Sequence, residues 1–420
     1  ILEKLNMVEL AQVTVYAQGC GMILGALVGS MMADIYGRRR LLYISLAGML
    51  ALHCLMALSI SWIMFIFMRM ISVGCAGATL VISFVTVVEF VGPEWRDACT
   101  CSCFWVLGAV LISMEALATQ HWRWLALLSG GLCLPLVATF FTSTESVRWL
   151  QCQHRFTEAE WGFREVVSVN SQAVPDLTTL LDRSRGCIVN NMHIKKFTYL
   201  DLFHSLDSTK WTIALVYVCT VSSTVYFSLF WHVKDMTNFA YFNSFLPFLI
   251  DLPLAWSVVV LNRCLGRRWC LFLYAVASGF ALLSILILHI TGNVDFLPSL
   301  VTGLALFGKI GVTASLSLIL LITTEMYPTV TRCMGVAVAV SSGSGGAMLS
   351  RAFVFLESYH YTVPFVIYGL MMSSVGVLGL VFPETIRRPL KNVQQCRHRK
   401  IPLTEGARLV GRPPSLWDAV

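Results

Sequence analysis

The stretch ESVRWL, residues 145–150, follows a long apolar run, and a similar string, ETIR at 384–387, returns 239 positions later at the end of another apolar run. Two further charged motifs repeat in the same order. GRR at 37–39 returns at 266–268. The first and last residues of EFVGPEWR (89–96), a Glu and an Arg, return as the first and last residues of EMYPTVTR (325–332). This ordered repetition predicts two similar halves joined by a central segment.

The composition indicates that lipid, rather than water, surrounds most of the chain. Of its 420 residues 57% are hydrophobic and 13% charged, whereas soluble domains are about 25% charged. The strand-type alternation of an outer-membrane barrel is absent. We therefore expect an all-α polytopic membrane protein, with one helix for each of eleven apolar stretches of sufficient length: 12–32, 41–60, 62–88, 99–119, 122–141, 211–231, 242–261, 270–290, 297–322, 333–355 and 361–383.

The distribution of positive charge predicts the orientation. With the polar segment 142–210 in the cytosol, 24 of the 30 Lys and Arg residues fall in cytosolic connections, and only Lys4 and Lys234 fall in outer ones. This bias follows the positive-inside rule, so the net charge of +7 is a topology signal and not a sign of nucleic-acid binding. We expect an N-terminal bundle of five helices (1–141), a cytosolic central loop with short helices (142–210), a C-terminal bundle of six helices (211–385) and a cytosolic tail (386–420).

All the repeated charged motifs then lie on the cytosolic side, as two matched halves related by an axis along the membrane normal. They could form a latch that holds the two bundles together while a cavity faces outward, or they could only anchor helix ends. The matched sets favour the latch, because acids and bases at facing helix ends can form ion pairs. We call the residues concerned the cytosolic charge network: Asp34, Arg38, Arg39, Glu89, Arg96, Glu145, Arg148, Arg267, Arg268, Glu325, Arg332, Glu384 and Arg387.

Several of these motifs resemble those of a known family. GSMMADIYGRRR (29–40) resembles a signature of the major facilitator superfamily, while ESVRWLQCQHRFTEAE (145–160) and GKIGVTASLSLILLITTEMYPTVTR (308–332) are similar to motifs of its organic cation, anion and zwitterion transporters. The DLP at 251–253 ahead of LGRR at 265–268 is closest to the organic anion subgroup. The resemblance implies two pseudo-repeated bundles of twelve helices in total, and we expect the first of them to be missing from this chain.

The resemblance also implies which residues line a cavity, and this sequence differs from the family at some of these positions. Two cations expected in organic anion transporters are replaced by Ala255 and Ser344, which weakens an anion assignment because a buried cation is the natural partner of an anionic solute. Tyr226 and Phe227 match a pair of aromatic residues in the family. They could bind a flat or cationic solute, or simply pack between helices.

Ionisable residues inside apolar stretches are candidates for function. Asp251 and Lys309 lie near the middle of their stretches, where they could form a structural pair or contact the substrate. Glu115 and Arg351 lie near outer helix ends, where snorkelling accounts for them. We take Tyr226, Phe227, Asp251, Lys309 and Ser344 as the predicted substrate-binding residues.

Other chemistries are not supported by the sequence. GLALFGKI (303–310) nearly matches a nucleotide-binding loop, but it lies inside an apolar stretch and follows no strand. The CxCxC at 99–103 has the wrong spacing for a zinc site, and no nucleophile–base pattern is present. We expect no enzymatic activity, metal, cofactor or ATP.

The sequence therefore predicts a multi-pass protein of the plasma membrane that carries small organic ions, most consistent with anions, by alternating access without ATP. Its expected partners are the solute and the lipid bilayer. The alternative is a transport-inactive relative that acts as a receptor or scaffold, which the missing helix and the two replaced cations would suggest.

Overall fold

The computed structural model describes residues 2–101, 104–169, 198–234, 240–291, 298–355, 362–386 and 390. This part of the chain contains helices and no strands, as expected for an all-α protein. The helices are α1 (Leu2–Tyr36), α2 (Arg38–Ala57), α3 (Trp62–Phe90), α4 (Arg96–Cys101), α5 (Phe104–Thr119), α6 (Trp122–Gly131), α7 (Cys133–Ala138), η1 (Thr139–Phe141), α8 (Val147–Cys152), α9 (Phe156–Val169), η2 (Tyr199–Phe203), α11 (Leu206–Lys234), α12 (Ala240–Leu265), α13 (Arg267–Ile290), α14 (Pro298–Met326), α15 (Arg332–Phe355) and α16 (Val363–Gly379).

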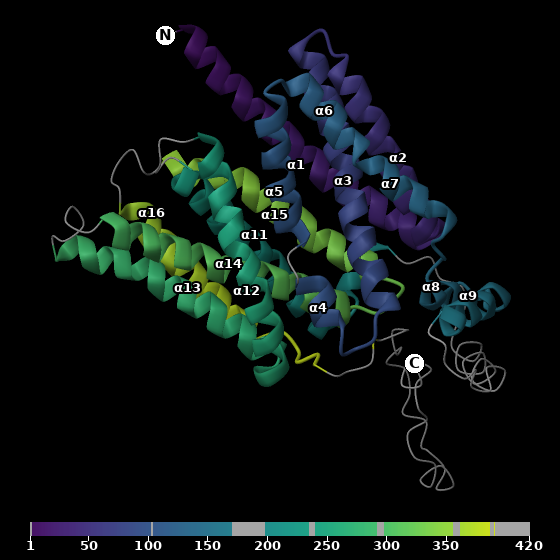
Figure 1. The fold of residues 1–420 in the computed structure, drawn as a ribbon. Coiled ribbons are helices and arrows are strands. Elements are labelled where there is room, and N and C mark those ends of the chain that lie inside the picture. The colour runs from purple at the N-terminus through teal and green to yellow at the C-terminus, as the bar shows by residue number, and fades with distance from the viewer. Residues whose placement is uncertain are drawn as a thin grey trace, which may run out of the picture.

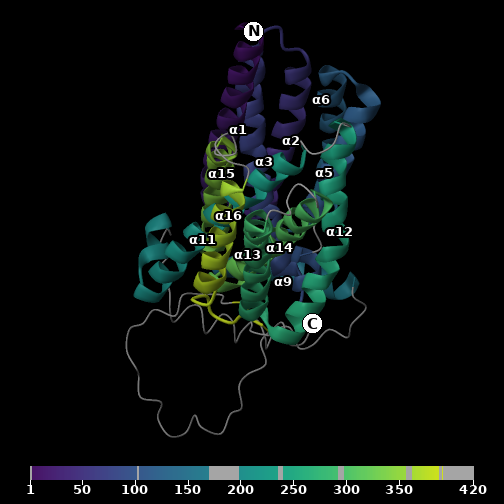
Figure 2. The same cartoon turned by 90° about the vertical axis from the view of Figure 1, so that its left-hand side faces the viewer.

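The helices form two groups, α1–α7 and α11–α16, which lie next to each other (Figure 1). Within the described residues, ten helical segments are long and apolar enough to cross a membrane, and α16 is a shorter apolar helix. Each of the eleven expected stretches falls on one of these segments. In Figure 2 the long helices run along the vertical, with the start of α1 at the top and α9 towards the lower end.

Some helix boundaries differ from the apolar stretches. The helices α2 and α13 begin at Arg38 and Arg267, three residues before the apolar stretches, because both arginines are buried in the first helical turn. The stretch 122–141 is divided into α6, α7 and η1. Charged residues at a helix start are therefore part of the helix when their charge is paired inside the protein.

Small residues allow the helices within each bundle to approach closely. A Cβ atom added to Gly25 of α1 would overlap the backbone of Gly74 in α3. In the other bundle, the Thr224 hydroxyl of α11 donates a hydrogen bond of 3.1 Å to the Gly346 carbonyl of α15. Close backbone packing and interhelical hydrogen bonds of this kind are typical of membrane helices.

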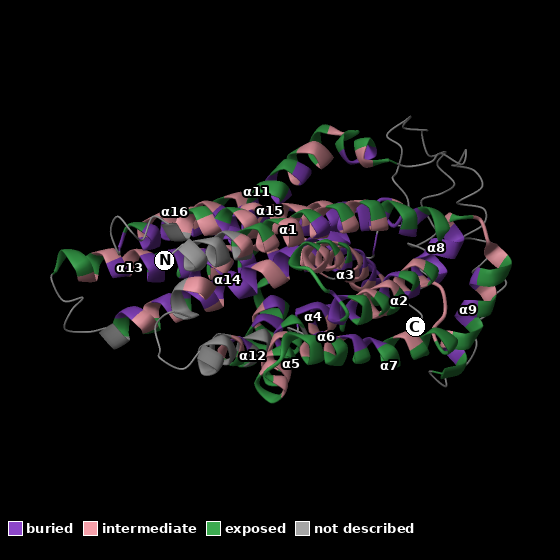
Figure 3. Cartoon of the chain, turned by 90° about the horizontal axis from the view of Figure 1, so that it is seen from above, coloured by how far each residue is buried: buried purple, intermediate pink, exposed green. Residues whose placement is uncertain are grey.

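The outer faces of the helices are exposed and apolar, while buried residues lie towards the interior (Figure 3). Phe280 and Val377, for example, are 67% and 62% exposed. A soluble protein would not present so many large hydrophobic side chains to water. This arrangement is the one expected when lipid contacts the outer faces.

A small cap covers one end of the first bundle. In it α8 and α9 pack through an apolar cluster that includes Trp149 and Phe163. The short helix η2 contacts α1, because the Tyr199 hydroxyl lies 2.6 Å from the Ser30 hydroxyl and donates to the Leu27 carbonyl at 2.5 Å. The described part of the segment between the bundles thus contains short helices, and part of it packs on the first bundle.

Candidate functional site

The two Gly-Arg motifs each begin a helix around a carboxylate. Gly37 and Gly266 have positive φ angles of 110° and 85°, which favour glycine. A Cβ at Gly37 would lie 2.7 Å from Glu145 Oε2, and one at Gly266 would lie 2.9 Å from Glu384 Oε2. Glycine therefore lets each carboxylate accept hydrogen bonds from the first backbone N–H groups of a helix, where negative charge is favourable. Glu145 accepts from the backbone N–H groups of Arg38 and Arg39, and Glu384 accepts from those of Arg267 and Arg268.

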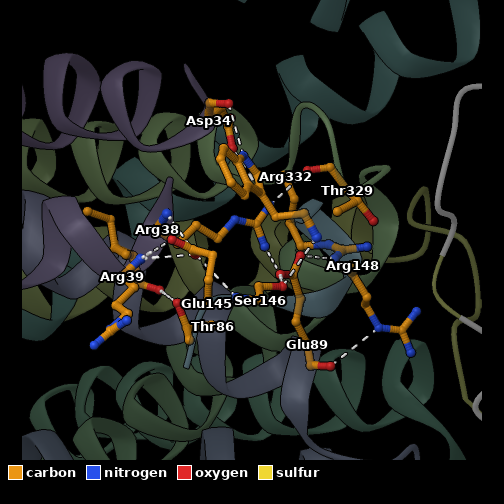
Figure 4. A network of polar contacts seen from close by, with 12 residues as sticks. Asp34, Arg38, Arg39, Thr86, Glu89, Glu145, Ser146, Arg148, Thr329 and Arg332 are labelled. Carbon is orange, nitrogen blue, oxygen red and sulfur yellow. Dashed lines mark hydrogen bonds and ion pairs between the residues drawn. The ribbon is translucent and has the colours of Figure 1, made fainter. Parts of the chain in front are cut away.

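Glu89 is the centre of the first charge cluster (Figure 4). Its carboxylate forms ion pairs with Arg38 of α2 and with Arg332 of α15, whose Nη1 lies 2.5 Å from Glu89 Oε1. The Ser146 hydroxyl donates to its other oxygen at 2.5 Å. The Arg148 Nε donates to the Glu89 carbonyl at 3.3 Å. The buried carboxylate thus has the partners that a charge removed from water needs.

Glu325 has the corresponding position in the second cluster. Its carboxylate forms an ion pair with Arg267 of α13, and Arg96 Nη1 of α4 lies 3.7 Å from it. Arg267 also donates to the Thr385 hydroxyl at 3.2 Å. The second half therefore repeats the two ion pairs of the first, with Glu325 in the place of Glu89, whereas Thr385 contacts the arginine and Ser146 contacts the carboxylate.

The two clusters connect the bundles reciprocally. Arg332 belongs to the second bundle and pairs with Glu89 of the first, whereas Arg96 belongs to the first bundle and pairs with Glu325 of the second. Arg38 also donates across the interface to the Thr329 carbonyl at 2.9 Å. The structure therefore brings the predicted residues together from both bundles at one end of the molecule.

A third cross-bundle ion pair was not predicted. Asp97 of α4 lies 2.8 Å from Arg267 Nη2, and both side chains are buried. Asp97 lies outside the motif residues selected from the sequence, and the position that matches it in the second half is Cys333. The signal that could have identified Asp97 is a carboxylate directly beside the repeated Arg96.

Three members of the cytosolic charge network have other surroundings. The Asp34 carboxylate, near the end of α1, lies 3.6 Å from Arg38 at the start of α2, and the Asp34 carbonyl accepts a hydrogen bond from Trp149 Nε1 at 3.0 Å. The Arg39 guanidinium points away from Glu89, stacks on the Phe140 ring at 4.5 Å and donates to the Phe140 carbonyl. Arg387 lies outside the described residues.

The position of Arg148 carries an electrostatic cost. Burial, followed by the positive charges of Arg332 and Arg96, lowers the pKa of the Arg148 guanidinium to about 8. Burial likewise raises the pKa of the neighbouring Cys152 thiol to about 11. Both shifts have burial beneath the cap as their largest cause.

An apolar layer lies next to the charged one. Buried residues of α1, α3 and α15 form one cluster across the bundle interface, which includes Ala26, Val81, Ile82, Val336 and Ala337. Ion pairs and this apolar contact together join the two bundles at this end of the molecule.

A cavity of about 740 Å³ lies between the bundles. Its wall includes Tyr226, Phe227 and Ser344 of the predicted binding residues, together with Trp105 and Trp231. No Asp, Glu, Lys or Arg of the described residues forms part of the wall. The cavity thus has the size and the aromatic, largely apolar wall of a small-molecule site.

Asp251 and Lys309 do not line this cavity; they pair behind it. Lys309 Nζ donates to Asp251 Oδ2 at 2.5 Å, and both side chains are almost fully buried. The ammonium also lies 5.2 Å from the centre of the Tyr226 ring, which does line the cavity. The pair is placed to support the cavity wall, and a direct contact with the solute remains a prediction.

Comparison with known proteins places this geometry in a family. Residues 7–396 match the family model described as "Sugar (and other) transporter". The chain belongs to that family. Two solved structures have a similar fold: the proton:xylose symporter XylE bound to 6-bromo-6-deoxy-D-glucose (TM-score 0.70, 16% identity, 91% of this chain and 87% of that one) and the human organic anion transporter MFSD10 (TM-score 0.59, 14% identity, 88% and 83%).

Relatives in this family include solute carrier 22 proteins. Mouse solute carrier family 22 member 4 is 28% identical over 391 residues, covering 90% of this chain and 68% of that protein. Human organic cation/carnitine transporter 2 is 28% identical over 398 residues, covering 91% and 69%. Rat solute carrier family 22 member 7 is 27% identical over 387 residues, covering 90% and 70%.

These findings confirm the predicted family and the major facilitator fold, and they make the chain a multi-pass membrane protein. The relatives are transporters rather than enzymes, which supports secondary transport as the general activity. One of these relatives is named as a transporter of organic cations and carnitine, and a preference for anions remains a prediction.

Proposed function

We propose that this chain moves small organic ions, preferentially organic anions, across the plasma membrane by alternating access. The observation that carries the proposal is an apolar cavity whose cytosolic end is closed by reciprocal ion pairs between the two bundles. Pairs that cross the interface can form in one state and separate in the other, whereas charges that only anchor helix ends would pair within their own bundle.

Closure through charges suits a cycle because it is reversible. Arginines and carboxylates that face water when the bundles separate regain hydration, so the loss of the buried pairs is largely offset. A purely apolar closure would instead expose hydrophobic surface to water on each opening. The cytosolic charge network can therefore hold the closed state without making the open state inaccessible.

The charges around the cavity favour an anionic solute. Two cations lie against aromatic rings of the wall: Lys309 lies against Tyr226, and Arg351 lies against Trp231. The neighbouring acid, Asp251, is engaged by Lys309. Positive rather than negative charge thus lies next to the wall that would contact a solute. The aromatic rings of this wall would contact a flat or apolar body.

Organic cations are the second candidate. The wall carries several aromatic rings and no basic side chain, and such rings attract organic cations. The names of the relatives point in the same direction.

Transport by the purified full chain in proteoliposomes would test the proposal and separate the two solute classes. We expect saturable uptake of radiolabelled aromatic carboxylates, without ATP, that exceeds uptake of matched quaternary ammonium compounds. Saturable uptake of the ammonium compounds alone would favour the second candidate. No saturable flux with any member of the panel, from protein that remains folded, would refute transport and favour a receptor or scaffold.

A further inference from the structure

We propose that Arg351, stacked on Trp231 at the outer end of the cavity, binds the carboxylate of an organic anion that enters or occupies the cavity. This inference rests on the proposed function and adds to it the group that would recognise the solute's charge. The sequence suggested only that Arg351 snorkels towards the membrane surface, and the structure gives it a different setting.

Arg351 continues the face of α15 that lines the cavity. Val340, Ser344 and Ala347 all form part of the wall, and Arg351 follows them at the same alternating spacing of four and three residues. Residues at this spacing lie on one face of a helix. Arg351 is 19 residues beyond Arg332, or about 28 Å along the helix, so it lies at the end of the cavity away from the cytosolic charge network.

The guanidinium lies against a residue of the cavity wall. Its Cζ atom lies 3.7 Å from the centre of the Trp231 ring, and Trp231 is itself part of the cavity wall. A guanidinium plane stacked on an aromatic ring keeps its N–H groups free to donate at its edge. The ring therefore orients the group that would meet the solute.

Arg351 also retains unused capacity for an anion. Its Nε is buried and has no hydrogen-bond partner among the described residues. The other cation near the cavity, Lys309, already donates to Asp251. A carboxylate that approached the edge of Arg351 could accept two parallel hydrogen bonds, the arrangement that guanidinium groups favour.

The neighbouring residues indicate the shape of the ligand. From Trp231, the rings of Phe227 and Tyr226 follow one turn further along α11, roughly 6–8 Å away along the axis. A ligand with a carboxylate at Arg351 and a flat aromatic body would reach these rings. The inferred class is therefore an aromatic or amphipathic carboxylate of about the length of a naphthalene ring system.

Equilibrium binding to the full chain in lipid nanodiscs tests this site without depending on transport. The probes are 2-naphthoate and its neutral isostere 2-naphthamide, and the readout is the ratio of their Kd values. We expect the wild type to bind naphthoate roughly tenfold or more tightly than naphthamide, because hydrogen bonds to a charged group are the strong ones. Arg351→Gln should remove this ratio and leave the Kd of naphthamide unchanged.

Arg123 provides a matched control, since it also lies over a tryptophan ring, at 5.2 Å, but that ring is Trp122 of α6, and no residue of α6 lines the cavity. Arg123→Gln should keep the wild-type ratio. Arg351→Lys keeps the charge without the planar fork, so we expect a ratio several-fold below that of the wild type. This variant also decides the matter if Arg351→Gln does not fold.

An unchanged ratio in the Arg351 variants would overturn the inference, as would a wild type with no preference for naphthoate. The proposed function would survive either result if the wild type still transports any organic ion in proteoliposomes. Absence of both binding and transport in the folded wild type would refute the two proposals together.

Discussion

Replacing Arg332 with Gln should open the cytosolic end. The change removes the cross-bundle ion pair with Glu89, in which the two atoms lie 2.5 Å apart, but Glu89 keeps its contacts with Arg38 and Ser146. The loss is therefore that of one charge-assisted hydrogen bond, about 1.5–3 kcal/mol, and not the larger cost of an unpaired buried carboxylate. Since about 1.4 kcal/mol is a factor of ten, the closed-to-open ratio should fall roughly tenfold to 150-fold.

The corresponding change in the second cluster, Arg96→Gln, should have a weaker effect. Arg96 lies 3.7 Å from Glu325, beyond hydrogen-bond distance, and Glu325 remains paired with Arg267. We therefore expect the ratio to change by less than about tenfold. The comparison of the two variants tests whether distance in the structure predicts the strength of the latch.

Distances between spin labels at positions 40 and 269, on the exposed cytosolic ends of α2 and α13, would report the separation of the bundles. In a cysteine-free background, we expect Arg332→Gln to move population from a short to a long distance. Glu158→Gln, which removes an exposed ion pair with Arg155 at the start of α9, is the control and should change nothing. An unchanged distance distribution in Arg332→Gln would show that the ion pair only anchors a helix end.

Three further predictions follow from single contacts. Lys309→Met should lower the free energy of unfolding by about 3–5 kcal/mol, because it leaves a buried carboxylate unpaired, and adding Asp251→Asn should restore most of the loss. Equal melting temperatures of the single and the double variant would contradict a structural pair. Gly25→Leu should abolish folding, measured by size-exclusion chromatography, because its side chain would overlap the backbone of α3, whereas Gly303→Ala, with open space around it, should be tolerated. Alkylation of Cys152 at pH 8 should be roughly a hundredfold slower than that of a free thiol, because burial raises its pKa from 9.0 to about 11 and lowers the thiolate fraction; mass spectrometry would measure the rate, and a rate equal to that in denatured protein would show that the cap is open.

The location of the repeated motifs could be predicted from the sequence because the duplication and the charge distribution both place these motifs at the same membrane surface. Positions such as Glu89 and Glu325 occur in equivalent local strings, and equivalent strings in parallel halves must lie at the same membrane surface. Helix positions followed from apolar length alone, since backbone groups in lipid must be paired within the helix. These two constraints were sufficient for the fold and for most of the cytosolic contacts.

Contacts outside the repeats required the structure. Asp97 and Tyr199 each have no counterpart in the other half, so nothing in a pattern of matched motifs identifies them. The placement of Lys309 depends on the rotation of α14 and α12 about their axes, which side-chain packing determines. The stacking of Arg351 on Trp231 likewise joins residues 120 positions apart, and a helix-end arginine gives no sign of it in sequence.

The contacts between the bundles are not symmetric, because the two bundles contribute unequal numbers of acids and bases to them. In two of its three cross-bundle ion pairs the acid comes from the first bundle and the base from the second, namely Glu89 with Arg332 and Asp97 with Arg267. The third, Arg96 with Glu325, runs the other way and is the longest at 3.7 Å. A perfectly duplicated protein would have equal numbers in both directions and no net field between its halves. Since unlike charges attract each other over distances comparable to the Debye length, the unrepeated Asp97 adds an attraction towards Arg267 that also favours reclosure from a state in which the bundles have separated.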